Sequence, residues 1–221
     1  MFCTSSNFDN PPYSLPNLDK VVNTFPDFVD ASEESALLGL LGRQLYDAFI
    51  AGLDALPDEY DEDSATVIGT EYIYGNDIWE ALTVTTGVFP VEGVAWTLVE
   101  ADNKWLKLKN GAEYTHESKV YQWRGMVWLL IPYVYSQWLE ANVDSFTGSG
   151  VVTDANENSQ VGSPLVRICN SYNDFARRSG VTESPGYYTM VDSLYGFLYV
   201  EEDDYEDWLW ESPETINPFD L

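Results

Sequence analysis

The sequence predicts a mainly α-helical (α+β) fold: a helical bundle core with short β-hairpins, an extended N-terminal arm and a C-terminal tail. Three observations predict this class. Long segments repeat apolar residues every three or four positions, as helices with one buried face do. Shorter segments between them are rich in β-branched and aromatic residues and are interrupted by glycine, which is typical of hairpins. The two chain ends mix proline, acids and isolated aromatic residues.

The charge of the chain is strongly negative and unevenly distributed. The 221 residues carry a formal net charge of −27, yet 45% of them are hydrophobic, which is enough to form a core. Residues 1–63 hold 13 acids and two bases, and residues 183–221 hold 11 acids and no base, whereas residues 64–182 hold 13 acids and 8 bases. This balance excludes nucleic-acid binding through a basic face and binding to an anionic membrane. A surface past which DNA moves without binding remains compatible with it, and so does acidity that only serves solubility.

Residues 1–30 predict an extended arm, because four prolines stand among Asn, Ser and Asp. Its aromatic side chains need a surface on which to dock, and Phe2, Phe8 and Tyr13 are therefore candidate partner-binding residues. The arm has no basic region followed by an apolar run, so no secretory signal is expected. Two isolated cysteines are too few for a disulfide framework, which favours synthesis in a reducing cytoplasm.

The second region, residues 31–200, is expected to form the main domain. A first helix is predicted within residues 30–56, starting at Ser32 with Glu33 and Glu34 in its first turn. Leucine and phenylalanine then follow helical spacing, and the acidic segment 57–64 ends the helix.

Short strands are predicted within residues 66–75 and 88–100. The motif GTEY (69–72) recurs as GAEY (111–114), and each copy is followed by a tryptophan. Two similar hairpin-to-helix units explain this recurrence, and chance similarity explains it equally well.

The segment KVYQWRGMVWLLIPYVYSQWLE (119–140) predicts a buried core helix. Crossing a membrane takes roughly 20 apolar residues, and Arg124 and Glu140 bracket too few. Pro132 should bend this helix near residue 128, because it removes a backbone donor and crowds the preceding turn.

Two further helices follow a polar loop. One starts at Pro164, presents an apolar face that includes Cys169, and ends before Gly180. The other lies within residues 187–200. The tail, residues 201–221, sets aromatic residues among acids, and these need a docking surface on this chain or on a neighbouring subunit. Its candidate partner-binding residues are Trp208, Trp210 and Phe219.

A search for chemistry finds no catalytic signature, so we expect no enzyme, no cofactor and no metal site. The single histidine, His116, falls in an expected turn, and no nucleophile motif, phosphate loop or Cys-x-x-Cys occurs. Residues 154–165 begin like a calcium loop but place Ser159 and Leu165 where glycine and glutamate are required. An alternative function is a carbohydrate-binding or glycoside-hydrolase-like acidic protein that stacks sugars on tryptophan platforms.

Several motifs resemble one family. They are LLGLLGRQLYDAFIAGL (37–53), WLKLKNGAEYTHESKVYQWRGM (105–126), an aromatic helix ending in YSQWLE, and FTGSGVV (146–152). Together they are similar to head-tail connector or adaptor (neck ring) proteins of tailed bacteriophages, in particular those of crAss-like and other Bacteroidetes phages. The resemblance covers roughly residues 35–180 and carries no catalytic residues.

The resemblance implies a structural virion protein. It implies a homo-oligomeric ring, commonly of twelve copies, beneath the portal protein and above the next neck or tail protein. Double-stranded DNA would pass the bore without sequence-specific binding. Such a protein would be made and assembled in the host cytoplasm and would reside in the virion neck or tail, away from any membrane. The arm and the tail do not match the family and could contact the portal, a neighbouring subunit or the next ring.

Overall fold

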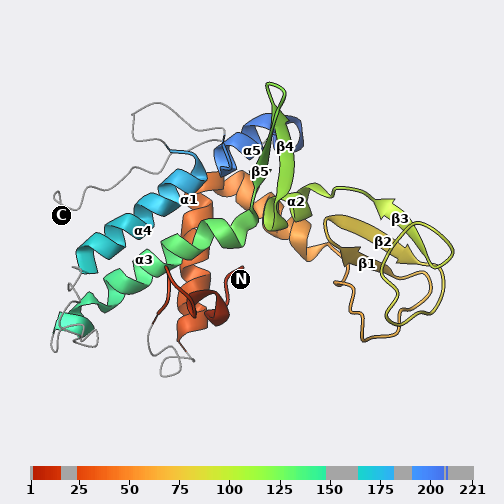
Figure 1. The fold of residues 1–221 in the computed structure, drawn as a ribbon, viewed down its shortest axis with the longest axis horizontal. Coiled ribbons are helices and arrows are strands. Elements are labelled where there is room, and N and C mark those ends of the chain that lie inside the picture. Colours follow the sequence, from red (N-terminus) through yellow and green to blue (C-terminus); the bar gives the residue numbers. More distant parts are fainter. Residues whose placement is uncertain (1, 16–23, 148–163, 182–190, 207, 209–221) are drawn as a thin grey trace.

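The structure, a computed structural model, describes residues 2–15, 24–147, 164–181, 191–206 and 208 (Figure 1). Within these residues the helices form a body to which two small antiparallel sheets are attached, so the predicted α+β fold class is confirmed. The helices are α1 (Phe25–Asp54), α2 (Lys104–Asn110), α3 (Gly125–Thr147), α4 (Pro164–Ser179) and α5 (Leu194–Val200). The strands are β1 (Glu71–Tyr74), β2 (Asp77–Ala81), β3 (Trp96–Glu100), β4 (Ala112–His116) and β5 (Lys119–Trp123). Short 3-10 turns lie at Ser5–Phe8 and Glu202–Asp204.

Helix α1 begins inside the segment that the sequence assigned to the arm. It starts at Phe25 with Pro26 in its first turn, where a missing N–H is harmless because first-turn amides lack helical acceptors. The predicted start at Ser32 was wrong, because Pro26 was interpreted as a mark of extended chain. Ser32 and Glu33 are instead buried in the middle of this helical stretch. The arm itself is not fully extended either, since it contains the 3-10 turn at Ser5–Phe8.

Gly42 divides α1 into two halves. Its φ of 72° and ψ of 160° are not helical, and glycine adopts such a positive φ at little cost because it has no Cβ. Figure 1 shows the two halves running in different directions. The first half packs in the helical body, and the second half leads toward β1.

Strands β1, β2 and β3 form an antiparallel sheet in the order β1-β2-β3. We call residues 57–103, which contain this sheet, the β unit. Strands β1 and β3 lie within the two segments predicted to be strands, and β2 was not predicted. The hairpin β1-β2 is followed by a loop and β3, so the interpretation of GTEY as the start of a hairpin-to-helix unit was wrong in its second half.

The β unit is attached to the body through the turn between β1 and β2. The Asn76 Nδ2 donates to the Gly111 carbonyl at 2.9 Å, and Ile73 and Ile78 beside this turn pack against Leu106 of α2. The opposite ends of the strands continue into two loops, residues 61–70 and 82–95, which point away from the body (Figure 1). We call these two loops the tip.

The second motif, GAEY, does open a hairpin that leads into a helix. Gly111 joins α2 to β4, and Gly125 joins β5 to α3, both with positive φ. The two glycines lie where two chain segments meet: a Cβ on Gly111 would stand 2.4 Å from the Trp123 carbonyl oxygen, and one on Gly125 would stand 2.6 Å from the Lys109 carbonyl oxygen. Glycine is therefore required at both ends of this hairpin.

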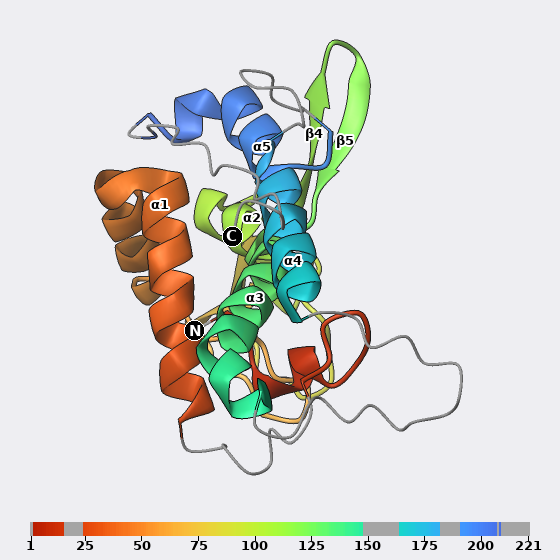
Figure 2. The same cartoon turned by 90° about the vertical axis from the view of Figure 1, so that its left-hand side faces the viewer.

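Helices α3 and α4 pack side by side, and α3 lies between α4 and the first half of α1 (Figures 1 and 2). The prediction of a core helix is confirmed from Gly125 onward, where α3 begins; Met126, Leu129, Leu130 and Val134 are fully buried. It was wrong for residues 119–123, which form the mostly exposed strand β5. Helix α4 occupies its predicted position, and Cys169 is buried in it. In the part of the chain that is described, we find no helix with the length and hydropathy needed to cross a membrane.

Pro132 lies inside α3 and leaves one backbone acceptor without its helical donor. It cannot donate to the carbonyl of Trp128, four residues earlier. The Arg178 guanidinium of α4 donates to that carbonyl instead and lies 4.6 Å from the Trp128 ring centroid. The helix continues through the proline because a neighbouring helix satisfies the acceptor that the proline leaves free.

Candidate functional site

No catalytic arrangement occurs in the described residues. His116 ends β4 at the hairpin turn, and its nearest ring neighbour is Tyr199 at 6.2 Å between centroids. Across the described ranges, no three His, Cys, Asp or Glu side chains are grouped so that they could hold a metal ion.

One buried acid was not predicted, and its partners show that it serves the fold. Glu33 is 3% exposed, and its carboxyl oxygens accept the backbone amides of Phe2 at 2.8 Å and Cys3 at 2.5 Å. Burial, with the Glu33 charge beside it, raises the pKa of the Cys3 thiol. The carboxylate thus fixes the first residues of the chain on α1 and leaves the thiol protonated and unreactive.

The tryptophans offer no sugar platform in the described part of the chain. All seven tryptophans found there are buried or half-buried: Trp79, Trp96, Trp105, Trp123, Trp128, Trp138 and Trp208. A sugar stacks on an exposed ring face, so these side chains do not provide the platforms that the alternative function needs. Trp210 lies outside the described residues.

The three aromatic residues of the arm pack on their own chain. Phe8 is fully buried against Phe25, Tyr13 is 7% exposed, and the ring of Phe2 stacks on Phe49 at 5.7 Å between centroids. The prediction that Phe8 and Tyr13 bind a partner was wrong, because the core of this chain already covers them. Phe2 is half-buried, and its ring is engaged in the same core.

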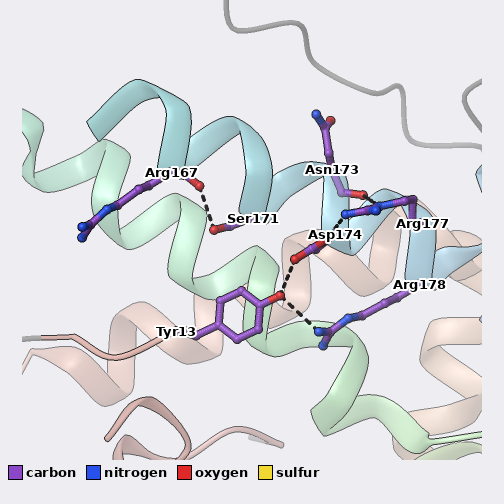
Figure 3. Close-up of polar contacts among 7 residues, drawn as sticks. All are labelled: Tyr13, Arg167, Ser171, Asn173, Asp174, Arg177 and Arg178. Carbon is purple, nitrogen blue, oxygen red and sulfur yellow. Dashed lines mark hydrogen bonds and ion pairs between the residues drawn. The ribbon is translucent and has the colours of Figure 1, made fainter. Parts of the chain in front are cut away.

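Tyr13 joins the arm to α4 through its hydroxyl (Figure 3) and to α3 through its ring, which lies 5.6 Å from that of Tyr135 between centroids. Its hydroxyl donates to Asp174 Oδ2 at 2.7 Å and accepts from Arg178 at 3.1 Å, and Arg177 pairs with the other oxygen of Asp174. Burial raises the pKa of Tyr13 and lowers the pKa of Arg178. The Tyr13 hydroxyl and the Arg178 guanidinium bond to each other and to other groups of this chain, so the cluster holds the arm in place.

A cavity of about 390 Å³ opens between the arm and α4. Tyr13 and Tyr135 form its aromatic wall, and Arg167 and Asn170 stand at its α4 side. Arg167 is exposed, and Figure 3 shows its guanidinium pointing away from the Tyr13 cluster. The two helix residues before it, Leu165 and Val166, are also exposed, at 45% and 44%.

Trp208, the one described aromatic candidate of the tail, packs on the body. Its indole Nε1 donates to the Leu40 carbonyl at 3.3 Å, and its ring lies 5.7 Å from that of Tyr195. The partly buried side chain of Trp208 is therefore packed against its own chain. Trp210 and Phe219 lie outside the described residues.

Exposed apolar side chains gather instead on the β unit. Eleven of the 16 most exposed large apolar residues in the described ranges lie between Val67 and Val99, and Val94 is 89% exposed. Eight of these belong to the tip: Val67, Ile68, Leu82, Val84, Val88, Phe89, Val91 and Val94. Exposed apolar side chains concentrated on two neighbouring loops are typical of an interaction site.

The tip is ordered by hydrogen bonds between its two loops. The Thr66 amide donates to the Thr85 carbonyl at 2.9 Å, and the Gly87 amide donates to the Glu62 carbonyl at 2.9 Å. A preformed surface loses little conformational entropy when it binds.

The β unit also carries charge of a single sign. Residues 57–103 contain 11 acids and no Lys or Arg, whereas residues 104–182 contain 7 acids and 8 bases. The charge of the middle of the sequence therefore separates into an acidic β unit, residues 57–103, and a segment of nearly balanced charge, residues 104–182. Sequence reasoning missed this surface, although the run of valines without a helical period and without a base was its visible signal.

Comparison with protein-family models, with curated proteins and with solved structures finds no match for this chain. The functional argument therefore rests on the residues and on their geometry.

Proposed function

We propose that this chain is a structural virion protein: a head-tail connector or adaptor subunit that forms a ring under the portal, through which double-stranded DNA passes. The observation that carries the proposal is the projecting β unit, with its ordered, apolar and base-free tip. An exposed apolar surface of this kind suits a protein whose role is assembly.

Two further features support the proposal. The residues that carry the family resemblance stand at the joints of the fold: Gly42 divides α1, Gly111 opens the β4-β5 hairpin, and Gly125 joins this hairpin to α3. The acidic surplus of the chain suits a bore that does not hold phosphate groups by charge.

The alternative function as a carbohydrate-binding or hydrolytic protein has weaker support. It requires an exposed tryptophan, and the described tryptophans are all at least half-buried. The carbohydrate-binding alternative would therefore need a site that includes Trp210.

Assembly with a portal ring tests the proposal. The first step is to establish whether a neighbouring reading frame encodes a portal protein. The full chain would then be mixed with that portal protein and analysed by size-exclusion chromatography with light scattering and by negative-stain electron microscopy. We expect a ring beneath the portal, with an added mass of about 300 kDa for twelve copies of 25.0 kDa. A chain that stays free of the portal and is missing from purified virions by mass spectrometry would contradict the proposal.

A further inference from the structure

Two exposed surfaces at opposite ends of the molecule complement each other. The tip of the β unit lies at one end of the long axis, and the start of α4 lies at the other (Figure 1). Both surfaces are apolar, the first through eight side chains and the second through Leu165 and Val166. Neither can reach the other within one chain, because the helical body separates them.

The charges of the two surfaces are opposite. The tip contributes Asp61, Glu62, Asp63 and Glu92 and no base. The α4 surface presents the exposed cation of Arg167 beside the cavity, whereas Lys107, Lys109 and Arg124 are paired with acids of their own chain. An acidic apolar tip and a cationic apolar face with a cavity form a matched pair.

We propose that the tip of one copy docks on the α4 face of a second copy, with Leu165, Val166 and Arg167 as the receiving residues and the tip valines as the inserted ones. This inference rests on the proposed function and deepens it by naming the contact between subunits. Because the two surfaces differ, each copy uses its tip once and its α4 face once. A contact of this heterologous kind repeats from copy to copy and closes into a ring when the rotation allows it.

The negative charge of the whole chain does not prevent this contact. At 0.15 M salt the Debye length is about 8 Å, so charges beyond the contact are largely screened and the local pairing decides. Copies held side by side on a template meet at a high effective concentration, so a modest intrinsic affinity is enough for assembly.

Two variants separate the two halves of the contact. The tip variant Val91→Asp/Val94→Asp adds charge to side chains that are 66% and 89% exposed. The face variant Leu165→Asp/Arg167→Asp removes the receiving cation. The control Ser118→Asp/Val120→Asp adds the same two charges as the tip variant on the exposed β4-β5 turn, away from both surfaces.

Sedimentation velocity of the full chain, alone from micromolar to millimolar concentration and with the portal ring, provides the readout. We expect the wild type and the control to form oligomers and each variant alone to lose at least 100-fold in association. A mixture of the two variants should form a dimer of about 50 kDa that grows no further, because one intact tip meets one intact face in this pair.

Three outcomes would overturn the inference: a wild type that is monomeric both alone and with the portal, a tip variant that assembles like the wild type, or a variant mixture that stays monomeric. The proposed function would survive the second or the third outcome if the wild type still formed a ring on the portal. It would fall with the inference only if portal binding and virion incorporation were lost as well.

Discussion

The helical body and the β unit contain the same kinds of apolar side chain but bury them to different extents. The body gathers its aromatic and aliphatic residues into one large core that joins the arm, α1, α3, α4 and α5. The β unit buries one small group of its own, Trp79 with Ala81 and Trp96, and packs Ile73 and Ile78 against Leu106 of α2. It leaves the eight large apolar residues of the tip exposed. Even its buried Trp79 Nε1 has no hydrogen-bond acceptor. This difference indicates that the body provides most of the stability of the fold, whereas the β unit provides an exposed surface on which a partner can bind.

Replacing one tryptophan in each region would test this division with the largest effect. Trp123 is fully buried, donates to the Leu108 carbonyl at 3.0 Å and stacks on Phe197, so Trp123→Ala should lower the free energy of unfolding by about 4 kcal/mol. Trp96→Ala, in the β unit, should leave the body folded and raise amide exchange only within residues 57–103. Denaturant unfolding and hydrogen exchange measure the two results. A global transition of equal size in both variants would show that the two regions form one cooperative unit.

The arm should belong energetically to the body. Glu33→Ala removes the acceptor of two buried backbone amides, and we expect a loss of about 3 kcal/mol in the free energy of unfolding together with fast exchange at Phe2 and Cys3. Glu34→Ala, at the exposed neighbouring position, is the matched control. An unchanged stability would mean that the arm contributes nothing to the core.

Alkaline pH should weaken the body before the β unit. Burial raises the pKa of Tyr114 from 10.0 to about 12, and burial also raises the pKa of Tyr205. The folded state holds these protons more tightly than the unfolded state, so the stabilisation is complete below pH 10 and is lost as the pH rises toward 12 and beyond. By pH 12, ionisation of Tyr114 alone should lower the free energy of unfolding by about 2 kcal/mol. Denaturant unfolding curves at increasing pH measure this loss of stability. In Tyr114→Phe the free energy of unfolding should depend less on pH.

The tip should contribute least to stability. Val94 is 89% exposed, so Val94→Asp should change the free energy of unfolding by less than about 0.5 kcal/mol. Thermal unfolding of the isolated monomer checks this value. A clear loss of stability would show that the tip packs within its own chain and is not available to a partner.

The sequence was most informative where local chemistry decides. Pro164 at the first position of α4 and Gly180 just after its end located that helix, and the apolar period of α3 identified the core. Local patterns were misleading at Pro26, because a proline favours the first turn of a helix as well as an extended chain. The partner-binding prediction for Phe8 and Tyr13 failed for a tertiary reason: an aromatic residue has the same sequence signal whether its own core or a partner covers it. The valines and acids of the tip stand in the sequence, but the sequence does not show that β1, β2 and β3 bring its two loops together into one surface.

The break at Gly42 has a geometrical consequence for assembly. In a closed head-to-tail ring, each copy must turn by a full circle divided by the number of copies, which is about 30° for twelve. The second half of α1 leads to the β unit, so the angle at Gly42 contributes to the direction in which the tip leaves the body. A residue with a Cβ would resist the positive φ at this position. A single backbone angle would thus help to determine how many subunits the ring can hold, and the diameter of the bore would follow from it.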